Sequence, residues 1–188
     1  MVSAYLSLIV LLAILRLFEL ALSRRNAAWV FEQGGIEVGQ GHFRVMKALH
    51  AAFLIGCVVE VWLLRRPFEP VLGFTMLGLL VLTQGLRYWA IFSLGKLWNV
   101  RVIVIPGSEP VSRGPYRFLR HPNYLAVVLE GIAIPLIHGA WITAVVFTVA
   151  NALLLRVRIR VEERALAEHC GYEERFSERR RFLPRWSA

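Results

Sequence analysis

Five apolar stretches constrain the fold of this chain more than any other feature of its sequence. They cover residues 3–22, 48–64, 70–92, 123–137 and 141–155. A helix needs about 20 apolar residues to cross the hydrocarbon core of a bilayer. The fourth stretch is short, and only residues 138–140 separate it from the fifth, which leaves room for no more than a tight turn. The pattern predicts an all-α integral membrane protein with about five transmembrane helices, of which the last two form a helical hairpin.

The composition agrees with this fold class. Hydrophobic residues make up 57% of the 188 residues, and the mean hydropathy is +0.55, whereas soluble domains are about 45–50% apolar. An ordinary soluble domain and a disordered chain are therefore excluded. Cys57 and Cys170 lie far apart, and neither has a second Cys or a His at ligand spacing. We therefore expect neither a disulfide framework nor a metal site.

The cations are distributed unevenly along the chain. Eighteen of the 22 Lys and Arg residues lie in residues 23–47, 93–122 and 156–188, whereas the connections on the other side hold only Arg65 and Arg66. Cytosolic loops of membrane proteins carry an excess of Lys and Arg. We therefore expect the N-terminus outside and the C-terminus in the cytosol. The same rule explains the net charge of +9 without a nucleic-acid partner.

The last helix is expected to extend beyond the membrane. Residues 141–170 contain neither Gly nor Pro, so a helix can continue through them for about 45 Å. The hydrocarbon core is only about 30 Å thick, and the last ten or more residues must form a C-terminal helical extension in the cytosol. On the same side, residues 100–105 form a short run typical of a β-strand, and Pro106-Gly107 marks a turn after it.

The densest polar cluster of the sequence is residues 114–124. Pro122 suits the first turn of a helix, where its missing N–H costs nothing, so Arg120 and His121 precede the fourth helix and Tyr124 lies in its first turn. A helix N-terminus beside an arginine favours an anionic group such as a carboxylate. The alternative interpretation is an interfacial belt of Tyr and Arg, which commonly flanks a membrane span.

A second cluster lies in the C-terminal extension, at residues 156–164. Arg158 and Glu162 are four residues apart and share one face of the helix. Either this is a solvated helix with surface salt bridges, or its face closes over the cluster at 114–124. The residues alone leave both interpretations open.

Acidic residues inside the apolar stretches form a third group. Glu130 falls in the middle of the short fourth helix, where a lone carboxylate costs about 2.5–3.5 kcal/mol. A paired or functional role is therefore expected, with Gln84 and Arg87 as candidate partners, and we count Glu130 among the substrate-binding candidates. Glu19 and Glu60 lie nearer helix ends, from where their side chains could simply reach the headgroups.

Together these motifs resemble the isoprenylcysteine carboxyl methyltransferase family of membrane enzymes. The resemblance rests on Gly-Pro-Tyr at 114–116, Arg-His-Pro-Asn-Tyr at 120–124, the hydrophobic hairpin, Arg158, and Glu162-Glu163. It covers about residues 84–184, and the N-terminal half is similar to a narrower bacterial branch associated with type III polyketide synthases. The resemblance implies a methyltransferase that uses S-adenosyl-L-methionine and methylates a carboxylate or acidic hydroxyl oxygen of a lipophilic substrate, such as a prenylcysteine, an alkylpyrone or a phenolic lipid.

The apolar stretches and the resemblance together predict an organisation of the chain, and the resemblance also implies a set of site residues. Residues 1–92 would hold three transmembrane helices with a cytosolic loop. Residues 93–188 would hold a cofactor-binding loop, the hairpin and a catalytic extension, all in one integrated domain of a bacterial cell-membrane protein. Arg158 would hold the acceptor oxygen and form the catalytic pair with Glu162. The cofactor contacts carried over by position are Ser108, Glu109, Pro110, Val111, Tyr116, His121, Pro122, Asn123, Tyr124 and Glu162.

The chemistry of the residues agrees with methyl transfer. Aromatic faces and carboxylates suit a sulfonium cation, and an acceptor that is already ionised at pH 7 needs an arginine to hold it rather than a strong base. Two alternatives stay open. A similar Arg-His-Pro-x-Tyr segment occurs in membrane sterol reductases that use NADPH, although those are larger proteins. A small transporter or structural membrane protein would leave the cluster at 114–124 without a role.

Overall fold

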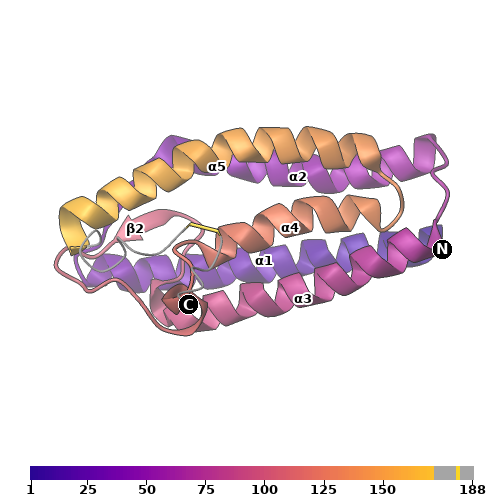
Figure 1. Cartoon of the computed structure of the whole chain (residues 1–188). Helices are drawn as coiled ribbons and strands as arrows, with labels where there is room; N and C mark the ends of the chain where they lie inside the picture. The colour runs from indigo at the N-terminus through magenta and orange to yellow at the C-terminus, as the bar shows by residue number, and fades with distance from the viewer. Residues whose placement is uncertain (172–180, 183–188) are drawn as a thin grey trace.

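Five helices make up most of residues 1–171 and 181–182, the part of the chain described by this computed structural model (Figure 1). They are α1 (Val2–Glu32), α2 (Gln40–Leu63), α3 (Pro70–Leu94), α4 (Pro122–Leu136) and α5 (Trp141–Cys170). Two short strands, β1 (Ile36–Val38) and β2 (Val102–Val104), and two 3₁₀ turns, η1 (Gly95–Leu97) and η2 (Gly114–Arg117), lie in the connections. The predicted all-α membrane fold is confirmed.

Helix lengths follow the apolar stretches. α1, α2, α3 and α5 are long and apolar enough to cross a membrane, whereas α4 has 15 residues and is shorter, as expected. α5 continues unbroken for 30 residues, and it ends where Gly171 adopts a left-handed φ of 60°, a conformation that costs glycine little. The hairpin of α4 and α5 and the long C-terminal extension are both confirmed.

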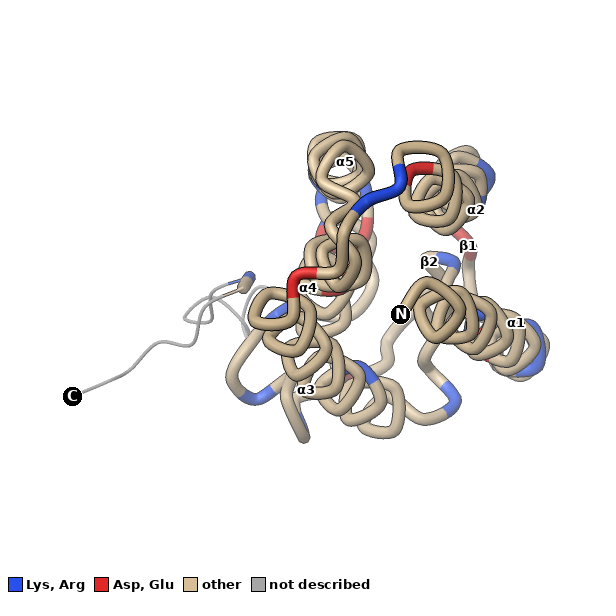
Figure 2. The backbone as a smooth tube through the Cα atoms, turned by 90° about the vertical axis from the view of Figure 1, so that its right-hand side faces the viewer, with Lys and Arg blue, Asp and Glu red and all other residues tan. Residues whose placement is uncertain are grey.

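The helices pack around one another in a fixed order. Seen along the bundle, α4 lies between α3 and α5, α2 lies beside α5, and α1 lies on the far side of the ring (Figure 2). The core between them includes Tyr5, Phe53, Ile134 and Phe147, which are at least nine-tenths buried. α4 and α5 approach closely at Gly131, where an added Cβ would lie 2.6 Å from Phe147. Large apolar side chains on the outside of the bundle are typical of lipid-facing surfaces.

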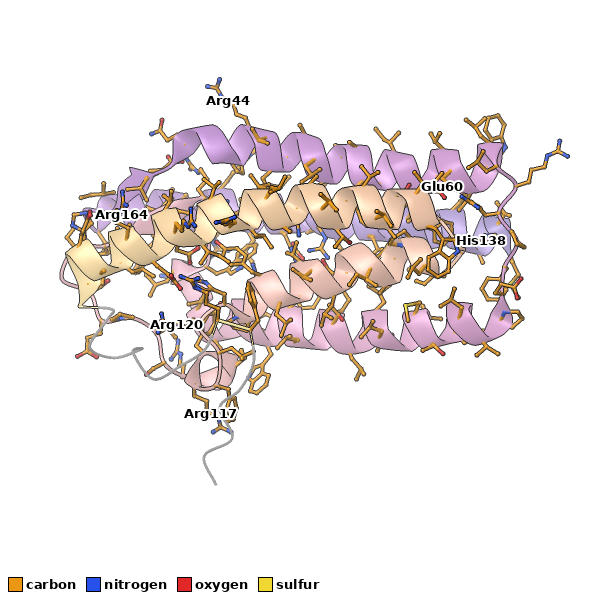
Figure 3. The ribbon with its side chains drawn as sticks, turned by 45° about the horizontal axis from the view of Figure 1, so that its top comes forward. Arg44, Glu60, Arg117, Arg120, His138 and Arg164 are labelled. Carbon is orange, nitrogen blue, oxygen red and sulfur yellow. The ribbon has the colours of Figure 1, made fainter. Side chains whose placement is uncertain are left out.

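The cation-rich connections meet at one end of the bundle. β1 and β2 pair there in antiparallel fashion, with Glu37 opposite Ile103, and Arg101 forms an ion pair with Glu37 at 2.8 Å. Arg117, Arg120 and Arg164 also lie toward this end, whereas Glu60 and His138 lie toward the opposite end (Figure 3). The cation-rich segments of the described chain therefore share one end of the bundle, as the distribution of the charges predicted. Of the tail, residues 172–180 and 183–188 lie outside the described residues.

Glu60 does not simply reach toward the headgroups, which its position near a helix end would allow. It is 6% exposed, and its carboxylate accepts hydrogen bonds from the backbone N–H groups of Ile142 and Thr143 at 3.1 and 2.7 Å. Arg66 donates to the same carboxylate at 2.9 Å. A carboxylate beside the first turn of a helix satisfies unpaired N–H groups and complements the helix dipole. Glu60 therefore fastens α2 to the start of α5.

A network of charged and polar side chains crosses the middle of the bundle. Glu19, which is also buried rather than reaching the headgroups, accepts hydrogen bonds from Arg16 and Arg87 at 2.7 and 2.6 Å. Glu130 accepts from Gln84 at 2.7 Å, from Arg16 at 3.0 Å and from Arg87 at 3.3 Å. The expected pairing of Glu130 with Gln84 and Arg87 is confirmed. The network joins α1, α3 and α4 through two cations and two anions.

Candidate active site

The extension of α5 lies over the first turn of α4. The Tyr124 hydroxyl donates a hydrogen bond to the Glu162 carboxylate and accepts one from Arg158 Nε at 2.7 Å. The Arg158 guanidinium also donates to the carbonyl oxygen of Val100, and its side chain is buried. Of the two interpretations of residues 156–164, the geometry favours a helix face that closes over the cluster at 114–124.

A second contact joins the same two helices one position further along α5. The Glu163 carboxylate accepts a hydrogen bond from His121 Nε2 at 3.0 Å and another from Arg181 Nε at 3.0 Å. Glu163 lies beyond the apolar segment of α5. Partial burial alone would raise the pKa of this carboxyl, but the hydrogen bonds from His121 and Arg181 outweigh burial and lower the pKa to about 2. The carboxylate is therefore charged at neutral pH.

A cavity of about 150 Å³ lies between β2, the loop after it, and the facing ends of α4 and α5; we call it the loop cavity. Ten of the residues predicted as site residues line it: Ser108, Glu109, Pro110, Val111, Tyr116, His121, Asn123, Tyr124, Arg158 and Glu162. Pro122 is buried at the first turn of α4 and positions its neighbours. The sequence clusters at 108–111, 116–124 and 158–162 therefore come together around one cavity.

A larger cavity of about 340 Å³ lies deeper in the bundle, between α1, α2, α4 and α5; we call it the membrane cavity. Its walls are mostly apolar, with side chains such as Leu17, Leu54, Val127 and Leu155. Leu17 on α1 is largely exposed on the outside of the bundle, so this wall also borders the lipid-facing surface.

The two cavities share a wall. It consists of Trp98, Asn99, Asn123, Tyr124 and Arg158, which line both. Within the described part of the chain, Trp98 Nε1 and Asn123 Oδ1 are buried atoms without a hydrogen-bond partner. Buried polar groups are normally paired, so these two residues of the shared wall retain hydrogen-bonding capacity that a ligand can satisfy.

Glu130 does not occupy the position expected of a substrate-binding residue. Of the described residues that line the two cavities, Arg16, Glu19 and Arg87 belong to the membrane cavity, whereas Glu130 lies behind them. A carboxylate on one face of α4 could be identified from the sequence. The distance from that face to a cavity depends on how α1 and α3 pack against it.

Several residues around the site were not predicted from the sequence. Trp98 and Asn99 complete the shared wall, and His50 and Asn151 line the membrane cavity. Asn151 carried a usable signal, because it is an amide within the apolar stretch at 141–155 and lies seven residues before Arg158. Polar residues inside membrane spans are often functional. Trp98 carried no comparable signal, since aromatic residues are common at the ends of spans.

Comparisons with known proteins agree with this architecture. A sequence model of the Isoprenylcysteine carboxyl methyltransferase (ICMT) family matches residues 76–168. The chain is 42% identical over 163 residues to the uncharacterized protein YpbQ of Bacillus subtilis. This match covers 86% of the present chain and 96% of YpbQ. It is also 26% identical over 154 residues to an uncharacterized protein of Haemophilus influenzae, and this match covers 81% of the present chain and 89% of the relative.

A solved structure shares the fold. The eukaryotic intramembrane Ras methyltransferase ICMT superimposes with a TM-score of 0.52 at 20% sequence identity, over 73% of this chain. The chain spans half the length of that solved protein, since the match covers 50% of it. The matched segment 76–168 includes the polar cluster at 114–124, the hairpin and both Arg158 and Glu162. The chain therefore belongs to the isoprenylcysteine carboxyl methyltransferase family and is a multi-pass membrane protein of this class of methyltransferases.

Proposed function

We propose that this protein is an S-adenosylmethionine-dependent O-methyltransferase, and that it methylates a carboxylate or acidic hydroxyl oxygen of a lipophilic acceptor. The observation that carries the proposal is the shared wall. The more polar of the two cavities, at the cation-rich end of the bundle, and the mostly apolar cavity within the bundle meet at Tyr124 and Arg158. A polar methyl donor and a lipid-like acceptor each require one of these environments, and transfer requires that the two lie side by side.

The loop cavity has the chemical character that the cofactor needs. When bound, S-adenosylmethionine supplies a methyl group carried on a positively charged sulfur. Tyr116 and Tyr124 line the cavity with aromatic rings, and Glu162 contributes a carboxylate; both kinds of group favour a cation. Trp98 Nε1 and Asn123 Oδ1 supply an unpaired donor and an unpaired acceptor for its polar groups. In this proposal the residues at 108–111 and His121 complete the cofactor site.

Arg158 is suited to hold the acceptor oxygen. Its Nε and one terminal nitrogen are engaged by Tyr124 and Val100. The other terminal nitrogen lies 3.5 Å from the Met46 thioether sulfur, which is a weak acceptor, and Arg158 lines the membrane cavity. An anionic oxygen would replace the thioether as a better partner. No general base is required, because the acceptor is already ionised.

The same proposal assigns the sides of the membrane. The cation-rich end, which carries the loop cavity, faces the cytosol of a bacterial cell, with the N-terminus outside. The cofactor enters from the water on that side, and the acceptor enters the membrane cavity from the bilayer. Tyr124 and Glu162 position Arg158 from the cytosolic side of the shared wall.

Binding and transfer measurements on purified protein in lipid nanodiscs test this function. We expect S-adenosylmethionine and its demethylated product to bind by calorimetry, and labelled methyl to be transferred to an alkyl hydroxypyrone or a prenylcysteine. His121→Ala should weaken cofactor binding, whereas Arg44→Ala, on the outer surface of α2 (Figure 3), should not. Binding of NADPH in place of S-adenosylmethionine would overturn the proposal in favour of a reductase.

A further inference from the structure

Two polar side chains in the membrane cavity have no role in the proposed reaction. They are Asn151 on α5 and His50 on α2, and both line the cavity among mostly apolar residues. Of the charged groups there, Arg16, Glu19 and Arg87 pair with one another or with Glu130. Arg158 is assigned to the acceptor oxygen, and Lys47 is exposed, with its ammonium group over the Phe43 ring. Away from the shared wall, Asn151 and His50 are therefore the polar groups within the bundle that have hydrogen-bonding capacity left for an occupant.

Asn151 is buried without a partner. The residue is 2% exposed, and its Oδ1 has no hydrogen-bond partner among residues 1–171 and 181–182. A buried amide that makes no hydrogen bond destabilises the protein unless a ligand supplies the missing partner. A hydroxyl group suits either orientation of the amide, because it both donates and accepts.

His50 presents an acceptor to the same cavity. Its Nδ1 lies 2.9 Å from the carbonyl oxygen of Met46. Since a carbonyl only accepts, Nδ1 carries the proton, and Nε2 of the neutral ring is then an acceptor. The ring packs edge-on against Phe147 at 5.4 Å between centroids, and Phe147 lies one helical turn before Asn151 on α5. His50 and Asn151 thus approach the cavity from neighbouring helices at a similar depth.

The helix fixes the distance between this pair and the reaction centre. Asn151 and Arg158 are seven residues apart on α5, so they lie on the same face, two turns apart. At 1.5 Å per residue the separation along the axis is about 10 Å. Both residues line the membrane cavity, so one elongated molecule can contact both.

We propose that the membrane cavity selects an acceptor with a second hydroxyl group, about 10 Å from the oxygen that is methylated. Asn151 and His50 bind this second hydroxyl, and the apolar walls bind the hydrocarbon between the two polar groups. The inference rests on the proposed function for the identity of the first oxygen. The inference goes beyond the proposed function because it defines the class of acceptor. That class is a lipophile with two separated hydroxyl or acidic groups, in preference to a lipophile with a plain alkyl tail.

A pair of probes tests this inference without relying on turnover. The probes are an alkyl hydroxypyrone and the same molecule with one additional hydroxyl on its alkyl chain, about 10 Å from the hydroxyl oxygen on the ring that is methylated. Their dissociation constants are measured with protein in nanodiscs and corrected for partition into protein-free nanodiscs. We expect the hydroxylated probe to bind about tenfold more tightly to the wild type, the effect of about one hydrogen bond. Equal affinities would overturn the inference.

Two variants and one control test whether Asn151 and His50 cause the preference for the hydroxylated probe. In Asn151→Leu and in His50→Phe, which keeps a ring against Phe147, the ratio of the two affinities should fall toward one. Thr83→Val should keep the ratio, because Thr83 is buried on α3 and bonded to Leu79. A preference that survives in both Asn151→Leu and His50→Phe would overturn the assignment. Cofactor binding and methylation of the plain probe are scored separately, and their failure would count against the proposed function instead.

Discussion

Arg158→Lys keeps the positive charge at the shared wall but removes the planar guanidinium group, whose three nitrogens contact different partners. In the wild type, three parts of the guanidinium contact the Tyr124 hydroxyl at 2.7 Å, the Val100 carbonyl, and the Met46 sulfur at 3.5 Å. A lysine has one nitrogen at the end of a flexible chain. It cannot contact Tyr124 and Val100 and also present an N–H to the membrane cavity in a fixed direction.

The expected magnitude follows from the charge change in the reaction. The acceptor oxygen loses its negative charge as the methyl group arrives, so Arg158 contributes mainly by orientation and less by stabilising charge. A misplacement of about 1 Å costs about a hundredfold in rate, equivalent to about 2.7 kcal/mol. We therefore expect kcat to fall about a hundredfold in Arg158→Lys. The dissociation constant of S-adenosylmethionine should change less than about threefold, because the charge near the loop cavity is preserved.

Single-turnover transfer of labelled methyl, together with cofactor titration, measures these two quantities. The matched control is Arg156→Lys, the same change two residues away on an exposed part of α5. It should leave both quantities near wild type. The reasoning is refuted if Arg158→Lys transfers methyl within about threefold of the wild type. A parallel loss of cofactor affinity would instead assign Arg158 to the cofactor site.

Three further changes test other parts of the structure. Glu162→Gln should weaken binding of S-adenosylmethionine about tenfold, since it removes a negative charge beside a cation; unchanged affinity in calorimetry would remove Glu162 from the cofactor site. The lowered pKa of Glu163 means that its contribution to stability is present above its ordinary value of 4.5 and is lost as the pH falls toward 2. Thermal unfolding of Glu163→Gln should therefore depend less on pH in this window, and an unaltered pH profile would contradict the role of the His121 contact. In a background without native cysteines, Arg65→Cys should react with an impermeant maleimide outside the cell and Arg117→Cys only after permeabilisation; the reverse pattern would invert the topology.

The helices could be predicted because each one is determined by residues within its own segment of the sequence. Each span is an apolar run of sufficient length, and the extension of α5 follows from the absence of Gly and Pro across residues 141–170. The site cluster at 114–124 was also visible, since Pro122 marks a helix start and places the polar residues around it. These signals lie within one element, so they need no knowledge of how the elements pack.

Contacts between distant segments could not be predicted in the same way. Arg158 contacts Val100, and Asn26 donates to the carbonyl oxygen of Trp98 at 2.8 Å, but no periodicity in the sequence relates these positions. The role of Glu60 was missed for the same reason, because the N-terminus that it caps belongs to another helix. Such pairings arise only when the fold brings the segments together.

The polar contacts that could not be predicted also explain how the two cavities keep their geometry. Within a bilayer, burying apolar surface provides little net drive for helices to associate, so specific polar contacts and close packing fix their positions. Glu19 and Arg87 join α1 to α3, and Glu60 joins α2 to α5. Removing one member of a buried ion pair leaves an unpaired charge and costs about 3–5 kcal/mol. The network in the membrane therefore holds α1 against α3 and keeps it from closing on α5, which preserves the membrane cavity beside the shared wall.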